Sequence, residues 1–515
     1  MAYAITRSCC NDATCVAVCP VNCIHPTPDE PDFGRTDLLY IDPEACIDCG
    51  ACADACPVEA IRPTDELTGP DTVFIELNRR YYEENPTDHA WGAPSFPRSL
   101  PARAEPLRIA IVGTGPAASY TAQELLRSTD AQLTVLDRRS VSGGLLRLGV
   151  APDHTTTRRI SDHFAQVYRH PRLRLHLSTE IGRHLSHAEL AAHHHAVVYA
   201  TGAEGDRRLG LPGEELPGSL SATTVVGWYN GDPAVPADAV PLTAEHTAHA
   251  AHTPHAERVV IVGNGNVALD ITRVLLQDPD GLAGTEIAAH ALAALRSSRV
   301  REVVLLARRG PEDAAWTAPE FLALRELPGV EVVLTDDPAT LATVAAALPG
   351  EKAALLAGLP VVPADAPPPP AGTRRITLRF HTTPVGLTGG QRVEGIEVRA
   401  TGTPDGPATT VPAGLVIRSI GHHGTPVPGL PHDERTGTLP NELGRVTDPA
   451  TGRPLPGTYV VGWAKRGPVG GIGSNRGCAQ ETVAALLDDA AARTLPSPSG
   501  TGTDFGRLLR RRARR

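Results

Sequence analysis

Nine of the ten cysteines of this 515-residue chain lie within its first 56 residues. Cys46, Cys49, Cys52 and Cys56 form the run CIDCGACADACP. Thiols at such short, fixed spacing bind metals far more often than they form disulfides in a reducing compartment. The CxxCxxCxxxCP pattern is typical of two-cluster iron–sulfur proteins, in which the first three thiolates bind one cluster and the fourth binds the other. Zinc is the alternative, but a second CxxxCP upstream favours iron–sulfur clusters.

In the upstream sequence CCNDATCVAVCP, Cys15 and Cys19 match the CxxxCP end of that pattern, but the CxxCxxC part that precedes it is missing. The two-cluster crossover predicts that Cys19 completes the site of Cys46, Cys49 and Cys52, which then holds a 4Fe-4S cluster.

Cys15 and Cys56 need a further ligand, which is either Cys9 or Cys10. Because neighbouring residues point in different directions, we expect one of the two to bind, and we favour Cys9. Three thiolates predict a 3Fe-4S cluster, and a second 4Fe-4S cluster is the alternative if both bind. Cys23 is left as a buried thiol near a cluster.

Two glycine-rich turns follow apolar strands further along the chain. Gly113, Gly115 and Ala118 form GTGPAA after the strand RIAIV, and Asp137 ends the next strand, QLTVLD. The first glycine allows the turn, the second lets backbone N–H groups approach a pyrophosphate, and the small third residue lets helix and strand pack closely. Asp137 can accept hydrogen bonds from a ribose.

The second turn, GNGNVA, contains Gly263, Gly265 and Ala268. Here Arg308 and Arg309 end the next strand, where a carboxylate would repel a 2′-phosphate and two guanidinium groups can bind it. This turn therefore predicts NADP(H). A tight turn without a ligand is the alternative for either motif alone, but two motifs with opposite charge at the ribose position predict FAD together with NADPH.

Charge and hydropathy exclude other classes of protein. The net charge of −10 argues against a nucleic-acid-binding protein. No apolar run is long enough to span a bilayer, and the N-terminus lacks the pattern of a secretory signal, so we expect a cytoplasmic protein.

The chain divides into a cysteine-rich domain (1–78), a proline-rich linker (79–105), the two nucleotide-binding regions and a basic tail (491–515). We expect the histidine-rich segment at 244–257, the triplet His193–His195 and the tail to be solvated rather than metal-binding or docking segments.

The motifs IVGTGPAA, GLLRLGVAPDH, GNGNVALD, ARRGP and GWAKRGPVGGIGSN resemble those of adrenodoxin reductase-type ferredoxin–NADP reductases, over residues 106–490. With the cysteine motifs included, the whole chain resembles the actinobacterial members that carry a fused seven-iron ferredoxin. The resemblance implies an α/β flavoprotein with two Rossmann-type dinucleotide-binding domains, as in glutathione reductase, plus a small α+β ferredoxin-like domain. The FAD-binding domain would comprise 106–204 and 420–490, and the NADP-binding domain 205–419.

The resemblance also implies functional residues. The FAD would be lined by Ala118, Asp137, Leu145 and Ile181 and covered by Trp463, Gly470, Gly471 and Ile472. The NADPH would be bound by Asn264, Gly265, Asn266, Val267, Arg308, Arg309, Glu320 and Gly470. Asp153 and His154 would lie near the flavin as candidates for protonation or docking, with a helix N-cap and a surface histidine as the alternative.

These observations predict an NADPH:ferredoxin reductase. A flavin that takes up a hydride and releases single electrons would pass these electrons to the iron–sulfur clusters. The clusters would then reduce a ferredoxin, a cytochrome P450 or another one-electron acceptor. We expect a monomer. A thioredoxin-type disulfide reductase would need a redox CxxC beside the flavin, and only Cys478 lies outside the first domain. A non-catalytic relay subunit of a larger complex remains the alternative, while the intact GNGNVA and ARRG motifs argue against a degenerate redox sensor.

Overall fold

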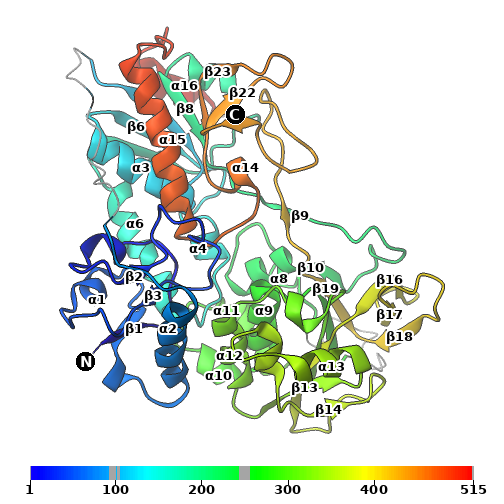
Figure 1. Ribbon diagram of the computed structural model, residues 1–515. Helices are drawn as coiled ribbons and strands as arrows, with labels where there is room; N and C mark the ends of the chain where they lie inside the picture. Colours follow the sequence, from blue (N-terminus) through cyan, green and yellow to red (C-terminus); the bar gives the residue numbers. More distant parts are fainter. Residues whose placement is uncertain (1, 92–99, 101–104, 243–255, 513–515) are drawn as a thin grey trace. The chain divides into compact units, whose positions relative to one another are not determined.

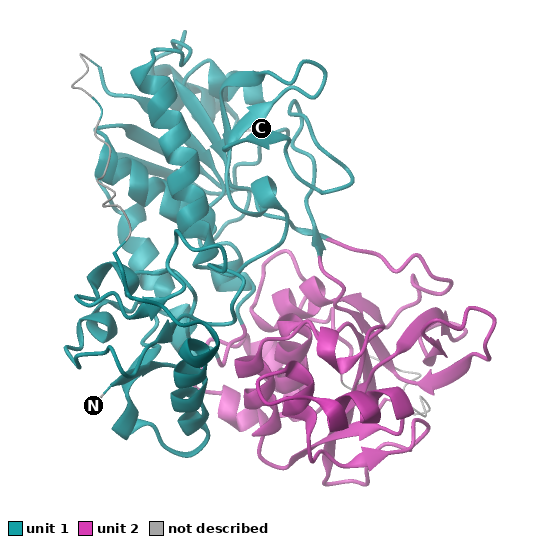
Figure 2. Ribbon diagram, viewed as in Figure 1, with its two compact units in different colours: residues 1–150, 154–205, 422–515 teal, residues 151–153, 206–421 magenta. Residues whose placement is uncertain are grey.

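The computed structural model describes residues 2–91, 100, 105–242 and 256–512, which form two compact units. Unit 1 comprises residues 1–150, 154–205 and 422–515, and unit 2 comprises 151–153 and 206–421 (Figure 2). The chain enters unit 2 at β9 (Gly205–Asp206) and returns to unit 1 at β20 (His422–His423). Within these ranges no helix has both the length and the apolar character that a membrane-spanning segment requires.

The N-terminal part of unit 1 is a small α+β structure, here called the cysteine module (residues 2–91). Its strands pair antiparallel, β1 (Tyr3–Ile5) with β4 (Ile61–Pro63) and β2 (Ile24–His25) with β3 (Tyr40–Ile41). Its helices are η1 (Val16–Val18), α1 (Ala51–Ala55), η2 (Thr64–Glu66), η3 (Gly69–Thr72) and α2 (Val73–Glu84).

Asn78 of α2 holds the module together. Its side-chain carbonyl accepts hydrogen bonds from the backbone N–H groups of Ile5 (3.1 Å) and Ile41 (2.8 Å), and its amide donates to the Ile5 carbonyl (2.9 Å). The residue is 2% exposed. One buried amide therefore satisfies backbone groups of two strands that do not pair with each other.

The module extends past the predicted boundary at residue 78. Helix α2 continues to Glu84, and the following residues fold back: His89 Nε2 lies 2.8 Å from Asp42 Oδ2, and Asn22 Nδ2 donates to the Ala90 carbonyl (2.8 Å). The first part of the predicted linker is therefore packed structure, because it supplies polar partners to buried groups of the module. Residues 92–99 and 101–104 of that linker lie outside the described residues.

The rest of unit 1 is built on a sheet of seven described strands in the order β21-β22-β23-β8-β5-β6-β7. The strands from β23 to β7 are parallel, and β21 and β22 extend that edge in antiparallel fashion. Their bounds are β5 (Arg108–Val112), β6 (Gln132–Leu136), β7 (Leu173–His176), β8 (Ala196–Tyr199), β21 (Asn441–Glu442), β22 (Arg445–Thr447) and β23 (Pro454–Val460). The helices are α3 (Pro116–Ser128), α4 (Leu145–Leu148), α5 (Thr155–Arg158), α6 (Ile160–Tyr168), α7 (His187–Ala191), α14 (Trp463–Arg466), α15 (Ser474–Ala491) and α16 (Gly502–Arg512), several of which are visible in Figure 1.

Unit 2 contains a parallel sheet, whose described strands have the order β10-β19-β11-β12-β15-β13-β14. Their bounds are β10 (Ser219–Ser221), β11 (Arg258–Val262), β12 (Glu302–Leu306), β13 (Val330–Thr335), β14 (Val361–Val362), β15 (Arg374–Arg379) and β19 (Leu415–Arg418). A small antiparallel sheet joins β16 (Thr382–Thr388), β17 (Gly395–Ala400) and β18 (Thr409–Pro412). The helices are α8 (Ala222–Tyr229), α9 (Asn266–Leu276), α10 (Pro279–Leu282), α11 (Ala289–Arg296), η6 (Pro311–Asp313), α12 (Ala318–Arg325), α13 (Pro338–Ala346) and η7 (Lys352–Leu356).

The two parallel sheets are buried on both faces, and the predicted α/β class is confirmed. In β5, Ile109 and Ile111 enter one apolar core while Ala110 and Val112 enter another. Alternate residues of a strand point to opposite faces, so a strand covered on both sides needs the continuous apolar run RIAIV rather than an alternating one. The strand RVVIV of β11 divides its side chains between two cores in the same way.

The predictions of solvated segments at His193–His195 and at the tail are wrong. His194 is 3% exposed, its Nδ1–H donates to the Leu190 carbonyl (2.9 Å), and its ring meets the Phe505 ring edge-on at 4.8 Å. Phe505 is itself buried and belongs to α16, whose Arg512 donates to Glu189 (2.7 Å). The tail therefore folds because Phe505 buries apolar surface against His194. The same contact packs the histidine triplet into the structure. Most of the histidine-rich segment at 244–257 lies outside the described residues.

We predict that Asn78→Ala destabilises the cysteine module. The change leaves the Ile5 and Ile41 N–H groups buried without partners, at about 1–3 kcal/mol each. Hydrogen exchange of the peptides that contain β1 and β3, measured by mass spectrometry, should rise at least about 30-fold, which corresponds to about 2 kcal/mol. Asn85→Ala is the matched control, because the Asn85 side chain is exposed and donates to the Tyr81 carbonyl of its own helix. Equal exchange in both variants would contradict the role given to Asn78.

Candidate functional site

The cysteines of the module surround two separate cavities. The first is lined by Cys19, Cys23, Cys46, Cys49 and Cys52. The second is lined by Cys9, Cys10, Cys15 and Cys56. The structure thus brings Cys19 together with the first three cysteines of the downstream run and carries Cys56 to the upstream ones. We call the first cavity the outer site and the second the junction site.

Local backbone geometry explains how one short run serves both sites. Asp48 and Gly50, on either side of Cys49, have positive φ angles (60° and 73°), which turn the loop tightly between Cys46 and Cys52. Helix α1 then begins at Ala51, carries Cys52 at its second position and ends before Cys56. One helical turn therefore separates Cys52, which lines the outer site, from Cys56, which lines the junction site.

Several cysteines of the two sites are buried as thiols. Burial raises the pKa of Cys9 to about 11 and that of Cys52 to about 12, and burial raises the pKa of Cys15 well above its usual value. Without a metal these three thiols would be protonated at neutral pH, whereas bound iron would replace the protons and compensate several thiolates at once. Backbone N–H groups already point at sulfur: Ala60 N–H donates to Cys56 Sγ (3.3 Å) and Cys23 N–H to Cys19 Sγ (3.4 Å). The residues present therefore fit iron–sulfur clusters.

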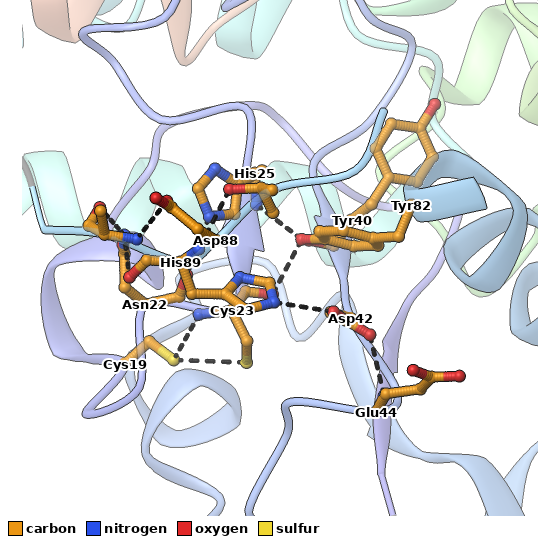
Figure 3. Close-up of polar contacts among 12 residues, drawn as sticks. Cys19, Asn22, Cys23, His25, Tyr40, Asp42, Glu44, Tyr82, Asp88 and His89 are labelled. Carbon is orange, nitrogen blue, oxygen red and sulfur yellow. Dashed lines mark hydrogen bonds and ion pairs between the residues drawn. The ribbon is translucent and has the colours of Figure 1, made fainter. Parts of the chain in front are cut away.

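Polar contacts around Cys23 stabilise the backbone beside the outer site (Figure 3). The Tyr82 hydroxyl donates to the Cys23 carbonyl (2.9 Å), and His25 N–H donates back to that hydroxyl (3.1 Å). His25 Nε2 lies 2.8 Å from the Asn22 carbonyl. Cys23 Sγ lies 3.5 Å from Cys19 Sγ, and hydrogen bonding between the two thiols lowers the pKa of Cys19. Cys23 is thus a buried neighbour of a predicted ligand, held in place by α2 and the β2 strand.

The first glycine-rich turn of unit 1 leaves room for a phosphate. Gly113 has φ of 112°, and a Cβ there would overlap the Ala200 carbonyl oxygen. A Cβ at Gly115 would meet no atom within 4 Å, so the N-terminus of α3 is open above this residue. Ala118 is 1% exposed and packs beneath the turn. Backbone N–H groups at such an open helix N-terminus can bind a pyrophosphate.

Asp137 lies beside this turn at the end of β6. Its carboxylate accepts hydrogen bonds from the Thr114 hydroxyl (2.5 Å) and from Arg139 N–H (2.8 Å). These bonds fix the carboxylate next to the turn, where a ribose hydroxyl can reach it. Of the other predicted FAD residues in this half, Leu145 begins α4 and is 38% exposed, whereas Ile181 is 8% exposed within the apolar core.

The predicted covering loop lies between α14 and α15. Trp463 Nε1–H donates to the Gly470 carbonyl (3.2 Å), and Gly470 has φ of 80°. Asn475 Nδ2 donates to the carbonyls of Gly471 and Ile472 (both 3.0 Å). The loop is therefore ordered by side chains at both of its ends. Asn475 was not predicted as a site residue, although it stands in the GGIGSN motif.

The second glycine-rich turn, in unit 2, repeats the geometry of the first. Gly263 has φ of 113°, a Cβ there would overlap the Ser419 carbonyl oxygen, and a Cβ at Gly265 would lie 3.8 Å from its nearest neighbour. Asn264 Oδ1 accepts from Ala315 N–H (3.4 Å), and Asn266 Oδ1 accepts from Thr317 N–H (2.8 Å). Val267 follows in the first turn of α9. The same opening for a dinucleotide phosphate is therefore present.

Arg308 and Arg309 are exposed after the end of β12. Arg309 Nη1 lies 3.6 Å from Asp313 Oδ1, and its side chain is 67% exposed, so the guanidinium group remains accessible to solvent. Two exposed guanidinium groups one strand away from the turn suit the 2′-phosphate of NADP(H).

Asp153 and Glu320 share one buried partner in unit 2. Arg273 of α9 is 5% exposed, and its Nε donates to Asp153 Oδ2 (2.6 Å) while its Nη1 lies 3.5 Å from Glu320 Oε2. Arg273 was missed by the sequence analysis because its partners are distant in the chain. His154 directly precedes α5 in unit 1 and makes no side-chain capping bond there.

Comparisons with known proteins agree with this arrangement. Residues 39–62 match a family model described as a 4Fe-4S binding domain. The chain is 47% identical over 525 residues to a probable ferredoxin/ferredoxin–NADP reductase of Mycobacterium tuberculosis, a match that covers 99% of this chain and 88% of that protein. It is 37% identical over 434 residues to the mitochondrial NADPH:adrenodoxin oxidoreductase of Bos taurus, covering 78% of this chain and 82% of that protein.

Among solved structures, Mycobacterium tuberculosis FprA in complex with NADPH superimposes with a TM-score of 0.66 and 38% identity, covering 79% of this chain and 90% of that one. The predicted fold with two dinucleotide-binding domains is confirmed. The chain therefore belongs to the family of ferredoxin/ferredoxin–NADP reductases.

Proposed function

We propose that this chain oxidises NADPH and passes the electrons singly to its own iron–sulfur clusters, and from these to a ferredoxin or another one-electron acceptor in the cytoplasm. The observation that carries the proposal is the presence of two cysteine-lined cavities in the same compact unit as the first dinucleotide turn. A bound flavin supplies the conversion from hydride transfer to single-electron transfer. The chain's own residues bind and orient the carriers.

The two dinucleotide turns differ in charge where a ribose would lie. The Asp137 carboxylate beside the first turn can accept ribose hydroxyl hydrogen bonds and would repel a 2′-phosphate, which supports FAD at Gly113, Gly115 and Ala118. Arg308 and Arg309 support NADP(H) at the second turn, Asn264–Val267. Trp463 and the loop Gly470–Ile472 would cover the flavin.

We propose a 4Fe-4S cluster in the outer site and a 3Fe-4S cluster in the junction site. Cys19, Cys46, Cys49 and Cys52 offer four thiolates in the outer site. In the junction site, burial and then the charges of Cys9, Asp12 and Cys56 raise the pKa of Cys15, which supports Cys9, Cys15 and Cys56 as the ligand set. Cys10 lines the same cavity, and burial and then the charges of Asp12, Cys9 and Cys56 raise its pKa, so Cys10 is the alternative ligand.

The function is tested by mixing the anaerobically purified chain with NADPH. We expect flavin absorbance to bleach and the electron paramagnetic resonance (EPR) signals of reduced clusters to appear, and we expect ferricyanide to sustain NADPH oxidation. A non-catalytic relay subunit would show none of these changes with NADPH, although dithionite would reduce its clusters. That outcome would exclude the proposed function.

We predict that Arg308→Ala lowers kcat/KM for NADPH roughly 10- to 100-fold, because a charge-assisted hydrogen bond to phosphate contributes about 1.5–3 kcal/mol. The kcat/KM for NADH, which has no 2′-phosphate, should stay unchanged. Arg296→Ala is the matched control, since Arg296 is an exposed arginine of α11 paired with Asp280. If NADPH and NADH respond equally to Arg308→Ala, the role assigned to this residue is wrong.

We predict that Cys10→Ser keeps the EPR signal of an oxidised 3Fe-4S cluster and that Cys9→Ser abolishes it. The reason is that Cys9, with Cys15 and Cys56, supplies the thiolates of the junction site. The signal of the reduced outer cluster serves as the internal control for correct folding in both variants. Loss of the 3Fe-4S signal in Cys10→Ser alone would reassign the ligand, and absence of that signal in the unmodified chain would indicate a second 4Fe-4S cluster.

A further inference from the structure

The junction site lies against the part of unit 1 that carries the first dinucleotide turn. Gly473 N–H, just before α15, donates to the Cys10 carbonyl (2.9 Å). A Cβ at Gly473 would overlap the backbone of Cys10, Asn11 and Asp12, so only glycine permits this approach. Arg476 of α15 donates to the Asp12 carbonyl (3.1 Å) and to the Thr14 hydroxyl (2.7 Å). The loop that contains Cys9, Cys10 and Cys15 is therefore bound directly to the N-terminus of α15.

The second segment of the junction site is buried in the same place. Val58 and Ala60, which follow Cys56, are each 1% exposed and belong to the apolar core that also contains Ile109 of β5 and Ala117 of α3. Both chain segments that supply cysteines to the junction site thus pack on the elements around the first dinucleotide turn. Gly473 directly follows the loop Gly470–Ile472, which is proposed to cover the flavin.

Tyr120 of α3 adds a polar group to this contact. It is 6% exposed, and within the described residues its hydroxyl has no hydrogen-bond partner. Burial and the charges of Asp12 and Cys10 raise its pKa. A buried hydroxyl without a partner is costly unless an acceptor is supplied. Tyr120 belongs to the same apolar core as Val58 and Ala60, so this hydroxyl lies where the module packs on the elements around the first dinucleotide turn.

The outer site has one side at the surface. Ile47 in its loop is 58% exposed, and Cys49 is exposed as well. Partial burial and the charges of Asp48, Asp54 and Glu66 raise the pKa of Tyr3, which lines the same cavity. The mouth of the outer site is therefore an apolar spot, centred on Ile47, with carboxylates around it.

The charge of the chain is concentrated in the same module. Residues 2–91 contain 17 Asp and Glu side chains against five Arg and no Lys, a net charge of −12, whereas the whole chain has −10. Such a field attracts basic partners and repels acidic ones. The negative charge of the module therefore indicates that a partner protein at the outer site has a basic face.

We propose that the junction site accepts electrons from the flavin and that the outer site is where they leave the protein, to a one-electron acceptor protein with a basic face that docks over Ile47, Asp48 and Asp54. This proposal rests on the proposed function and adds the order of the sites and the docking surface. One NADPH becomes NADP⁺ and one proton is released, while two acceptor molecules each gain one electron. Each electron passes from the junction site to the outer site before it leaves.

The order of the sites is tested in the unmodified holoprotein by rapid freeze-quench EPR after mixing with NADPH. We expect the signal of the oxidised 3Fe-4S cluster to decrease first and the signal of the reduced 4Fe-4S cluster to grow after it. Appearance of the reduced outer cluster before any change at the junction site would overturn the order. Flavin reduction without any change in clusters that dithionite can reduce would instead overturn the proposed function itself.

The docking surface is tested with cytochrome c, a basic one-electron acceptor protein, in a calorimetric titration at low ionic strength. The double variant Asp48→Asn/Asp54→Asn should weaken binding roughly three- to tenfold, because two charges at the rim of the contact are lost. The matched control is Glu83→Gln/Glu84→Gln, which removes two exposed charges from α2, a helix that Figure 1 shows well apart from α1. Equal weakening by the two variants, or no weakening by the first, would overturn the docking surface.

Discussion

The hydrogen bond from Gly473 N–H to the Cys10 carbonyl is the backbone contact that fixes the junction site on the rest of unit 1. A backbone donor can reach a backbone acceptor at 2.9 Å only where no side chain intervenes, and at residue 473 a Cβ would collide with three consecutive residues of the module. The contact therefore joins the loop of the junction site to the start of α15 by a direct backbone hydrogen bond. Arg476 and the apolar residues Val58 and Ala60 hold the same surfaces together.

A similar constraint shapes both dinucleotide turns. In each, the first glycine has φ near 112° and lies against a backbone carbonyl, that of Ala200 in one unit and that of Ser419 in the other. The backbone geometry of the two turns is thus nearly the same, and it determines only that a phosphate can approach a helix N-terminus. What distinguishes them is the side chain at the end of the following strand, a carboxylate fixed by Thr114 in one case and exposed guanidinium groups in the other.

Much of this fold was predictable because its signals are local. The spacing of Cys46 to Cys56, the strand–turn–helix motifs at Gly113 and Gly263 and the continuous apolar strands each depend on neighbours within about twenty residues. Features that depend on distant partners were missed or wrong. The tail folds because Phe505 meets His194, residues 85–90 fold back because Asn22 and Asp42 need partners, and Arg476 binds a loop more than 450 positions away. No periodicity or spacing in the sequence encodes such pairs.

The two cysteine sites show how one short motif can serve opposite environments. Helix α1 separates Cys52 from Cys56 by a single turn, so the run places ligands both in a site packed against the core of unit 1 and in a site with Ile47 and Cys49 exposed. The loop of the first site is bound to the N-terminus of α15, whereas Cys49 of the second site is exposed and accessible to a partner. The acidic side chains are compatible with this division because they gather in the module and leave the remainder of the chain nearly neutral. In this chain apolar packing, a backbone hydrogen bond and the ion pairs of Glu59 with Arg159 and of Asp12 with Arg476 hold the module to the rest of unit 1, and most of its other carboxylates remain for a basic partner.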